Sequence, residues 1–190
     1  MTILHIDSAI TGEASASREL TAAIVAELVA AEKDARVTYR DLAAEPLPHL
    51  TLPAYGAADS QAALAEFKTA DTVVIGAPMY NFTIPSQLKA WLDRILVAGE
   101  TFRYTEAGPE GLAGGKRVIV AIARGGLYGE DSAQRSIEHA ERYLASVFAF
   151  IGLPDVEFVI AEGLNYGPEA RASGVAAAHA QVRALLPIAA

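Results

Sequence analysis

Two serines near the N-terminus stand where they could bind an anion. Thr2–Asp7 has the pattern of a strand, and Ser15 and Ser17 follow it at the start of a segment with helical spacing. Serine is a favoured helix cap because its hydroxyl accepts hydrogen bonds from backbone N–H groups. Capping without any ligand is one interpretation. In the other, both hydroxyls and the helix amides face one point and bind a terminal phosphate.

The loop Pro78–Phe82 is a second candidate for ligand binding. It reads Pro-Met-Tyr-Asn-Phe and follows the strand-like run 72–77. Pro78 and Pro85 stiffen its two ends, and the loop offers backbone amides and Asn81 beside flat apolar side chains. Its aromatic side chains could instead fold into the core. If they face a ligand, a planar heterocycle with polar edges fits this surface.

A third candidate follows the run Arg117–Ala123. The paired glycines Gly125 and Gly126 let the backbone approach a ligand closely. Arg124 could offset negative charge on a bound ligand, or it could be a solvated arginine in an ordinary glycine turn. Three loops at three strand ends, each suited to part of one ligand, favour a bound mononucleotide.

Other common chemistries lack their residues. The absence of cysteine excludes disulfides, thiolate nucleophiles, iron–sulfur clusters and cysteine-built zinc sites. The four histidines show no pairing typical of metal ligands, so we expect no metal site. The sequence also has no Gly-x-Gly-x-x-Gly, no Walker A loop and no Gly-x-Ser-x-Gly nucleophile elbow. A serine-lined cradle for a monophosphate is the arrangement that remains.

Alternating strands and helices must position these loops. Strand-length apolar runs occur at 2–7, 36–40, 72–77, 117–123 and 156–161. Helical spacing occurs at 20–28, 88–96, 137–151 and from about Pro168 to Leu186. Apolar strands that alternate with helices predict an α/β fold with a parallel sheet covered on both faces. We expect the doubly wound, five-stranded flavodoxin-like order 2-1-3-4-5, with ligands outside the carboxyl ends of the strands.

Two stretches interrupt this alternation. Residues 41–59 contain Pro46, Pro48, Pro53 and Gly56, which predict an irregular excursion across the surface. Residues 101–116 contain an aromatic run followed by several glycines, which predicts a hairpin-like insertion at about 101–115. We find no repeat and no domain boundary, so we expect residues 1–190 to form a single domain.

Composition narrows the class of protein further. The chain is 52% hydrophobic, but no apolar run reaches the ~18 residues of a transmembrane helix. A net charge of −8 argues against nucleic acid as a partner. A strand-like run follows Met1 without a basic or secretory segment, so we expect a cytoplasmic protein that handles small molecules.

A set of motifs spread over the whole chain resembles one family. These are Ala77–Phe82, Thr101–Thr105, Gly108–Leu112, Arg124–Gly126, Phe150–Gly152 and Ala161–Gly163. Together they resemble the FMN-dependent NADH:quinone oxidoreductases, also called FMN-dependent NADH-azoreductases. The resemblance implies a flavodoxin-like homodimer with non-covalent FMN at the subunit interface. It also implies NADH or NADPH as donor and quinones or aromatic azo compounds as acceptors.

The resemblance assigns roles to individual positions. The family's phosphate-binding Ser-x-Ser corresponds to residues 15–17, its flavin loop to 79–82, and the turn beside the pyrimidine end of the flavin to 124–126. The full set of expected cofactor-binding residues is Ala9, Ser15, Ala16, Ser17, Pro78, Met79, Tyr80, Asn81, Phe82, Ala123, Arg124, Gly125 and Gly126. We expect Tyr104, Tyr128 and Phe150 around the substrate pocket, with Tyr104 and Phe150 as candidates for contributions from the partner subunit. Ala9 and Ala123 replace serines that many relatives carry, which removes two hydroxyl contacts.

The chemistry requires little from side chains. The flavin accepts a hydride at N5 and returns it, so we expect no catalytic acid or base and a ping-pong cycle at one shared site. We also expect backbone amides of the Tyr80 and Gly125 loops to stabilise the reduced ring. The alternative is a flavodoxin-type electron carrier that exchanges electrons only with protein partners. The predicted hairpin, absent from a minimal carrier, favours the enzyme. A hydrolase or transferase on the same sheet lacks its usual nucleophile motifs.

Overall fold

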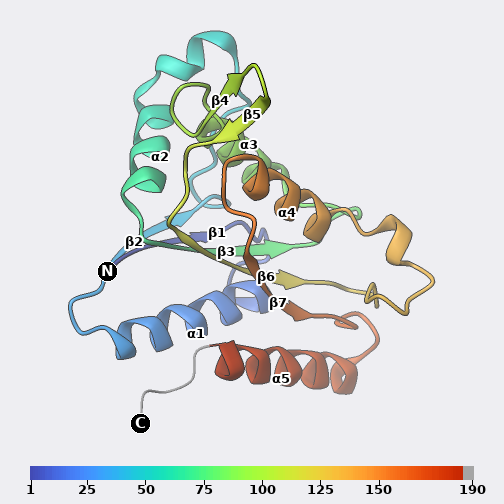
Figure 1. The fold of residues 1–190 in the computed structure, drawn as a ribbon. Coiled ribbons are helices and arrows are strands. Elements are labelled where there is room, and N and C mark those ends of the chain that lie inside the picture. The colour runs from blue at the N-terminus through green and yellow to red at the C-terminus, as the bar shows by residue number, and fades with distance from the viewer. Residues whose placement is uncertain (186–190) are drawn as a thin grey trace.

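A parallel sheet forms the centre of the molecule. The computed structural model describes residues 1–185. Its strands are β1 (Thr2–Asp7), β2 (Arg36–Asp41), β3 (Thr72–Pro78), β6 (Arg117–Ala123) and β7 (Val156–Ala161). They pair in parallel in the order β2-β1-β3-β6-β7 (Figure 1). Because β6 and β7 are the fourth and fifth strands of this sheet along the chain, the predicted flavodoxin-like order is confirmed.

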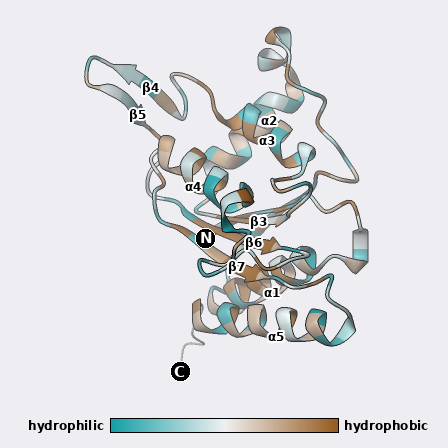
Figure 2. Cartoon of the chain, turned by 90° about the vertical axis from the view of Figure 1, so that its right-hand side faces the viewer, coloured by the Kyte–Doolittle hydropathy of each residue, from teal (hydrophilic) through white to brown (hydrophobic). Residues whose placement is uncertain are grey.

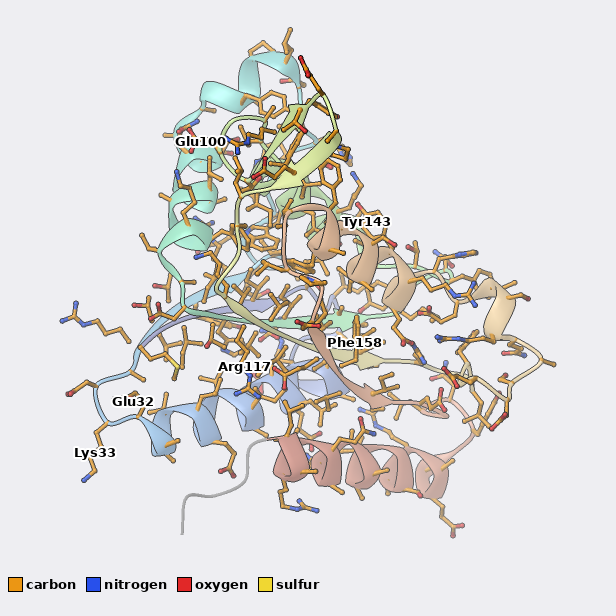
Figure 3. All side chains as sticks on the ribbon, in the orientation of Figure 1. Glu32, Lys33, Glu100, Arg117, Tyr143 and Phe158 are labelled. Carbon is orange, nitrogen blue, oxygen red and sulfur yellow. The ribbon has the colours of Figure 1, made fainter. Side chains whose placement is uncertain are left out.

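Helices cover both faces of the sheet. One face carries α1 (Ala16–Ala31) and α5 (Pro168–Leu185), and the other carries α2 (Ala58–Thr69), α3 (Ser86–Ile95) and α4 (Ala140–Phe150) (Figure 1). The hydrophobic core is accordingly divided in two by the sheet. The smaller cluster lies against α1 and α5, and the larger contains Phe67, Trp91 and Phe148 from the other three helices. Figure 2 shows the hydrophobic strands enclosed between these layers, and Tyr143 and Phe158 add to the larger cluster from α4 and β7 (Figure 3).

Helix α2 is a correction to the expectation for residues 41–59. That stretch is irregular only as far as a short 3₁₀ turn at Leu52–Gly56, and α2 begins at Ala58 and includes Asp59. Arg94 holds the irregular stretch before this turn in place, because its buried guanidinium donates a hydrogen bond to the carbonyl oxygen of Pro48. The last of the prolines, Pro53, lies before α2, and α2 is not among the helices predicted from the sequence.

The helix boundaries refine the remaining predictions. Ile137 lies in a 3₁₀ turn, and α4 begins only at Ala140, where the buried Glu138 carboxylate accepts from the amides of Ala140 and Glu141. Helix α5 starts at Pro168 as expected, and its predicted end at Leu186 lies outside the described residues. Within residues 1–185, no helix has the length and apolarity to cross a bilayer.

The predicted insertion is a two-stranded antiparallel hairpin. Strands β4 (Phe102–Thr105) and β5 (Gly108–Gly111) pair with each other and project from the body (Figure 2). The base of the hairpin is anchored to the end of α4. A Cβ atom on Gly111 would lie 2.1 Å from the amide nitrogen of Gly152, and the rings of Phe102 and Phe150 have centroids 4.7 Å apart. The hairpin is thus a fixed arm of the fold.

Candidate functional site

A cleft of about 230 Å³ lies at the carboxyl ends of β1, β3 and β6. Helix α1 contributes its N-terminus to one side, and the loops after β3 and β6 form the others. The structure brings these predicted residues together around it: Ser15, Ala16, Pro78, Met79, Tyr80, Ala123, Arg124 and Gly125. The cleft is also lined by Thr11, Ala14, Leu164, Asn165 and Arg171, which the sequence interpretation did not include. The carboxyl-end rule for parallel sheets therefore locates the cleft correctly.

The serine pair forms the N-terminal cap of α1. The Ser15 hydroxyl accepts from the amide of Arg18 and lies 3.0 Å from the Ser17 hydroxyl. Within the described part of the chain, no acceptor pairs with the amides of Ala16 and Ser17. Unpaired helix amides and the positive end of the helix dipole favour an anion at this position. The cap and the anion site are one structure, so the two interpretations of these serines are compatible.

A buried polar network supports the loop from below. Asp7, 1% exposed, accepts hydrogen bonds from the hydroxyls of Thr21 at 2.8 Å and Tyr39 at 3.1 Å. Arg18 bonds to the Tyr39 hydroxyl at 2.6 Å and pairs with Asp41 at 2.9 Å. Burial, together with the negative charge of Asp7, raises the pKa of Tyr39 to about 12. The guanidinium of Arg18 is therefore used to join β2 to the first turn of α1.

The loop after β3 is a tight, strained turn. Asn81 and Phe82 have φ values of 48° and 72°, and Tyr80 and Thr83 exchange backbone hydrogen bonds across them. Two consecutive left-handed residues are costly unless the surroundings hold them, and such strain is concentrated at functional sites. The Tyr80 hydroxyl accepts from the amide of Ile10, which ties this turn to the serine loop. A second hollow of about 570 Å³ shares Met79 and Tyr80 with the cleft and also contains Asn81.

Arg124 does not have the role expected for its charge. The side chain is 1% exposed, and its guanidinium lies among the carboxylates of Glu138, Glu141 and Glu162. Burial raises the pKa of Glu141, but hydrogen bonds from Arg135 and Arg124 outweigh this effect and place the pKa below its ordinary value. Because carboxylates already balance the charge of Arg124, we correct the expectation that it offsets charge on a ligand. Arg124 nevertheless lines the cleft, next to Gly125.

Several predicted residues lie beside the cleft lining. Ala9 is buried, Ser17 is buried behind Ser15, and Phe82 is 48% exposed at the tip of its turn. Gly126 accepts from the amide of Gly163. Among residues 1–185 of this single chain, the cleft wall contains none of Tyr104, Tyr128 and Phe150. Tyr104 is 75% exposed on the hairpin, and Phe150 packs against Phe102 at its base.

Thr11, Asn165 and Arg171 are the polar lining residues that sequence reasoning missed. Asn165 follows β7, and its amide donates to the carbonyl of Gly125 at 2.9 Å. Arg171 lies in the first turns of α5 and donates to the carbonyl of Ala14 at 2.8 Å. The loop after β7 ends at the same sheet edge as the other loops, and this position was the available signal. Among the described residues, no aspartate or glutamate lines the cleft. The carboxylates that pair with Arg124 are not part of this lining.

Among residues 1–185, no group of three or more histidine, aspartate or glutamate side chains is arranged to hold a metal ion. The cleft instead presents hydroxyls, backbone amides, the two arginines Arg124 and Arg171, and the apolar faces of Met79 and Tyr80. This donor set suits an organic ligand with a phosphate at one end and a flat ring system at the other.

Comparisons with known proteins agree with this geometry. A family model described as "Flavodoxin-like fold" matches residues 1–186. An FMN-dependent NADH:quinone oxidoreductase from Xanthomonas campestris pv. campestris is 55% identical over 97% of this chain and 99% of its own length. Azoreductase from Bacillus anthracis superposes with a TM-score of 0.86 at 30% identity, over 97% of this chain and 98% of that one. A B. anthracis FMN-dependent NADH-azoreductase in complex with FMN gives a TM-score of 0.82 at 26% identity, over 98% of this chain and 100% of that one.

These similarities extend along nearly the whole chain. They include the first strand, the hairpin and the last helix, so they are not limited to the sheet that all flavodoxin-like proteins share. The chain belongs to the family of FMN-dependent NADH:quinone oxidoreductases, built on a flavodoxin-like fold.

Proposed function

We propose that this protein binds FMN non-covalently in the cleft and transfers electrons from NADH or NADPH to quinones and aromatic azo compounds. The observation that carries the proposal is the meeting of the serine-capped helix, the Met79–Tyr80 wall and the Gly125 turn around one cleft. The family membership supports the same cofactor and the same donor.

The residues present fit FMN. Ser15 and the amides of Ala16 and Ser17 suit the monophosphate, because they offer hydrogen-bond donors at a helix N-terminus. Met79 and Tyr80 supply an apolar wall for a flat ring, and Asn165 and Gly125 place polar atoms at its edge. We therefore propose that the predicted site residues bind the phosphate, the face of the ring or the edge of the ring, and we add Asn165 to these residues.

The protein's contribution is to bind, orient and shield. Bound FMN supplies the hydride-accepting and hydride-donating atom, so no side chain has to act as acid or base. Within the described residues, the amides of Asn81 and Gly125 have no intramolecular acceptor, whereas the amide of Tyr80 is bonded to Thr83. Donation to the ring would therefore come from the amides of Asn81, which belongs to the Tyr80 loop, and Gly125, so the proposal keeps both expected loops and specifies the amide in each.

We further propose that the active form is a cytoplasmic homodimer. Exposed apolar side chains support the dimer: Tyr104 is 75% exposed on the hairpin, Phe82 is 48% exposed in the turn after β3, and Ile137 is 39% exposed in the turn before α4. A second copy could cover these side chains and bring the aromatic hairpin to the partner's cleft. NADH as donor suits the cytoplasm, where this reductant is formed and used.

Two measurements test the proposal. The purified protein should be yellow and should release FMN on denaturation. It should oxidise NADH with benzoquinone or a simple azo dye and no added protein partner, and double-reciprocal plots at several acceptor concentrations should be parallel. Intersecting lines would reject the shared-site cycle. NADH oxidation only in the presence of a partner protein would favour the flavodoxin-type carrier, and a colourless protein that gains nothing from added FMN would reject both.

A further inference from the structure

Arg171 places a guanidinium beside the serine loop. It belongs to α5, far along the chain from the serine loop, yet it lines the same cleft as Ser15 and Ala16. Its Nη2 atom donates to the carbonyl oxygen of Ala14 at 2.8 Å, directly before the helix cap. The positive charge is thereby held at the end of the cleft where the amides of Ala16 and Ser17 are unpaired.

The other two arginines near the cleft are already neutralised. Arg18 pairs with Asp41 at 2.9 Å and lies 3.5 Å from Asp7. Arg124 is surrounded by three carboxylates. Arg171, by contrast, has no carboxylate within ion-pair distance in residues 1–185. One cation at the cleft therefore has its charge uncompensated inside the protein.

A phosphate monoester needs such a cation. It carries close to two negative charges at neutral pH, and hydroxyls and amides alone leave this charge unbalanced. A guanidinium carries five N–H donors in a fixed plane and binds phosphate oxygens through charge-assisted hydrogen bonds. The bond to Ala14 uses one N–H of Arg171 and leaves others available.

We propose that Arg171 recognises the phosphate of FMN and thereby makes the site prefer FMN to riboflavin. The inference rests on the proposed function, because it assumes that a flavin occupies this cleft. It assigns to α5 a part in cofactor selection that the serine loop alone does not explain. Arg171 is a binding residue here and takes no part in the redox step.

The test compares two flavins that differ only in the phosphate. Dissociation constants of FMN and riboflavin are measured for the apoprotein by quenching of flavin fluorescence. We expect Arg171→Met to weaken FMN binding roughly tenfold to a hundredfold, as loss of a hydrogen bond to a charged group does. Riboflavin binding should be unchanged, and the salt dependence of FMN binding should become shallower. Arg171→Lys should recover part of the affinity for FMN.

Controls separate this role from a structural one. Arg183→Met changes an exposed arginine in the last turn of the same helix and should leave both constants unchanged. Equal weakening of FMN and riboflavin by Arg171→Met would mean that Arg171 only shapes the Ala14 loop and would overturn the inference, as would unchanged binding of both. A wild-type protein that binds neither flavin would instead reject the proposed function itself.

Discussion

Gly76 shows how closely single atoms are fitted beneath the cleft. A Cβ atom at this position of β3 would lie 2.6 Å from Asp7 Oδ1 and 3.3 Å from the methyl group of Thr21. Asp7 cannot move freely, because Thr21 and Tyr39 both hydrogen-bond to its buried carboxylate. The polar network that supports the serine loop therefore requires glycine at position 76.

Gly76→Ala should consequently destabilise the protein. We expect a loss of about 1–3 kcal/mol in the free energy of unfolding, the usual cost of inserting a group into a packed interior. Denaturant unfolding monitored by the fluorescence of Trp91 measures it. Gly56→Ala is the matched control, since no atom lies within 4 Å of the Cβ position there and its backbone is not left-handed. Equal stability of the two variants would contradict the fit described for Gly76.

The sequence predicted site residues where the residue type itself carries the signal. Three patterns gave this signal, because each is suited to ligand binding at the end of a strand. They are serines at a helix start, aromatics between prolines, and paired glycines. Arg171 and Asn165 gave no such signal, because a single arginine on a helix or an asparagine in a loop is common on any surface. The charge of Arg124 was misassigned for a related reason, since its three carboxylate partners come from distant positions in the chain.

At the scale of elements, the Arg124 cluster joins β6, α4 and the end of β7. Glu141 is held in its charged form by Arg135 and Arg124, so its pKa is lowered in the folded state. A carboxylate with a lowered folded pKa stabilises the protein above its unfolded pKa, and this contribution is lost as the pH falls through the folded value. The cluster should therefore contribute at neutral pH and weaken in acid.

Glu141→Gln tests this pH dependence. We expect the melting temperature at pH 7 to fall by a few degrees, because a buried guanidinium loses one of its charged partners. The difference from wild type should shrink as the pH is lowered from about 5 towards 3. Glu110→Gln is the control: this glutamate pairs with Arg103 on the exposed hairpin, where ion pairs contribute little. A difference for Glu141→Gln that is independent of pH would contradict the electrostatic explanation.

Elements with strong hydrophobic patterns were predicted well, and α2 was not. The sheet has the five expected strands, and β4 and β5 form the expected hairpin. These elements could be predicted from the sequence because valine-rich runs and clustered glycines are strong local signals. Helix α2 buries mainly Ala63, Leu64 and Phe67, too few apolar residues to stand out after a proline-rich segment. Its place is determined by packing against α3, where the rings of Phe67 and Trp91 meet edge to face at 6.1 Å. Contacts between distant segments, and not local pattern, define this helix.

At the scale of the whole molecule, the hairpin should be part of the subunit interface. Tyr104→Asp places a charge on its most exposed aromatic position and should shift the protein towards monomers, as measured by light scattering after size-exclusion chromatography. Val29→Asp on α1, across the sheet from the hairpin, should leave the mass unchanged. A dimer that survives Tyr104→Asp intact would place the interface elsewhere.

The hairpin is fixed at its base where Gly111 meets Gly152, and this limits how the two copies of the proposed homodimer could share work. A rigid arm could not fold back to serve its own chain, so each cleft of that dimer would depend on the arm of the other copy. A chain damaged in its arm and a chain damaged in its cleft would each be inactive alone. Mixed together, they would restore one complete site per pair, and wild-type activity per chain would fall as the protein is diluted.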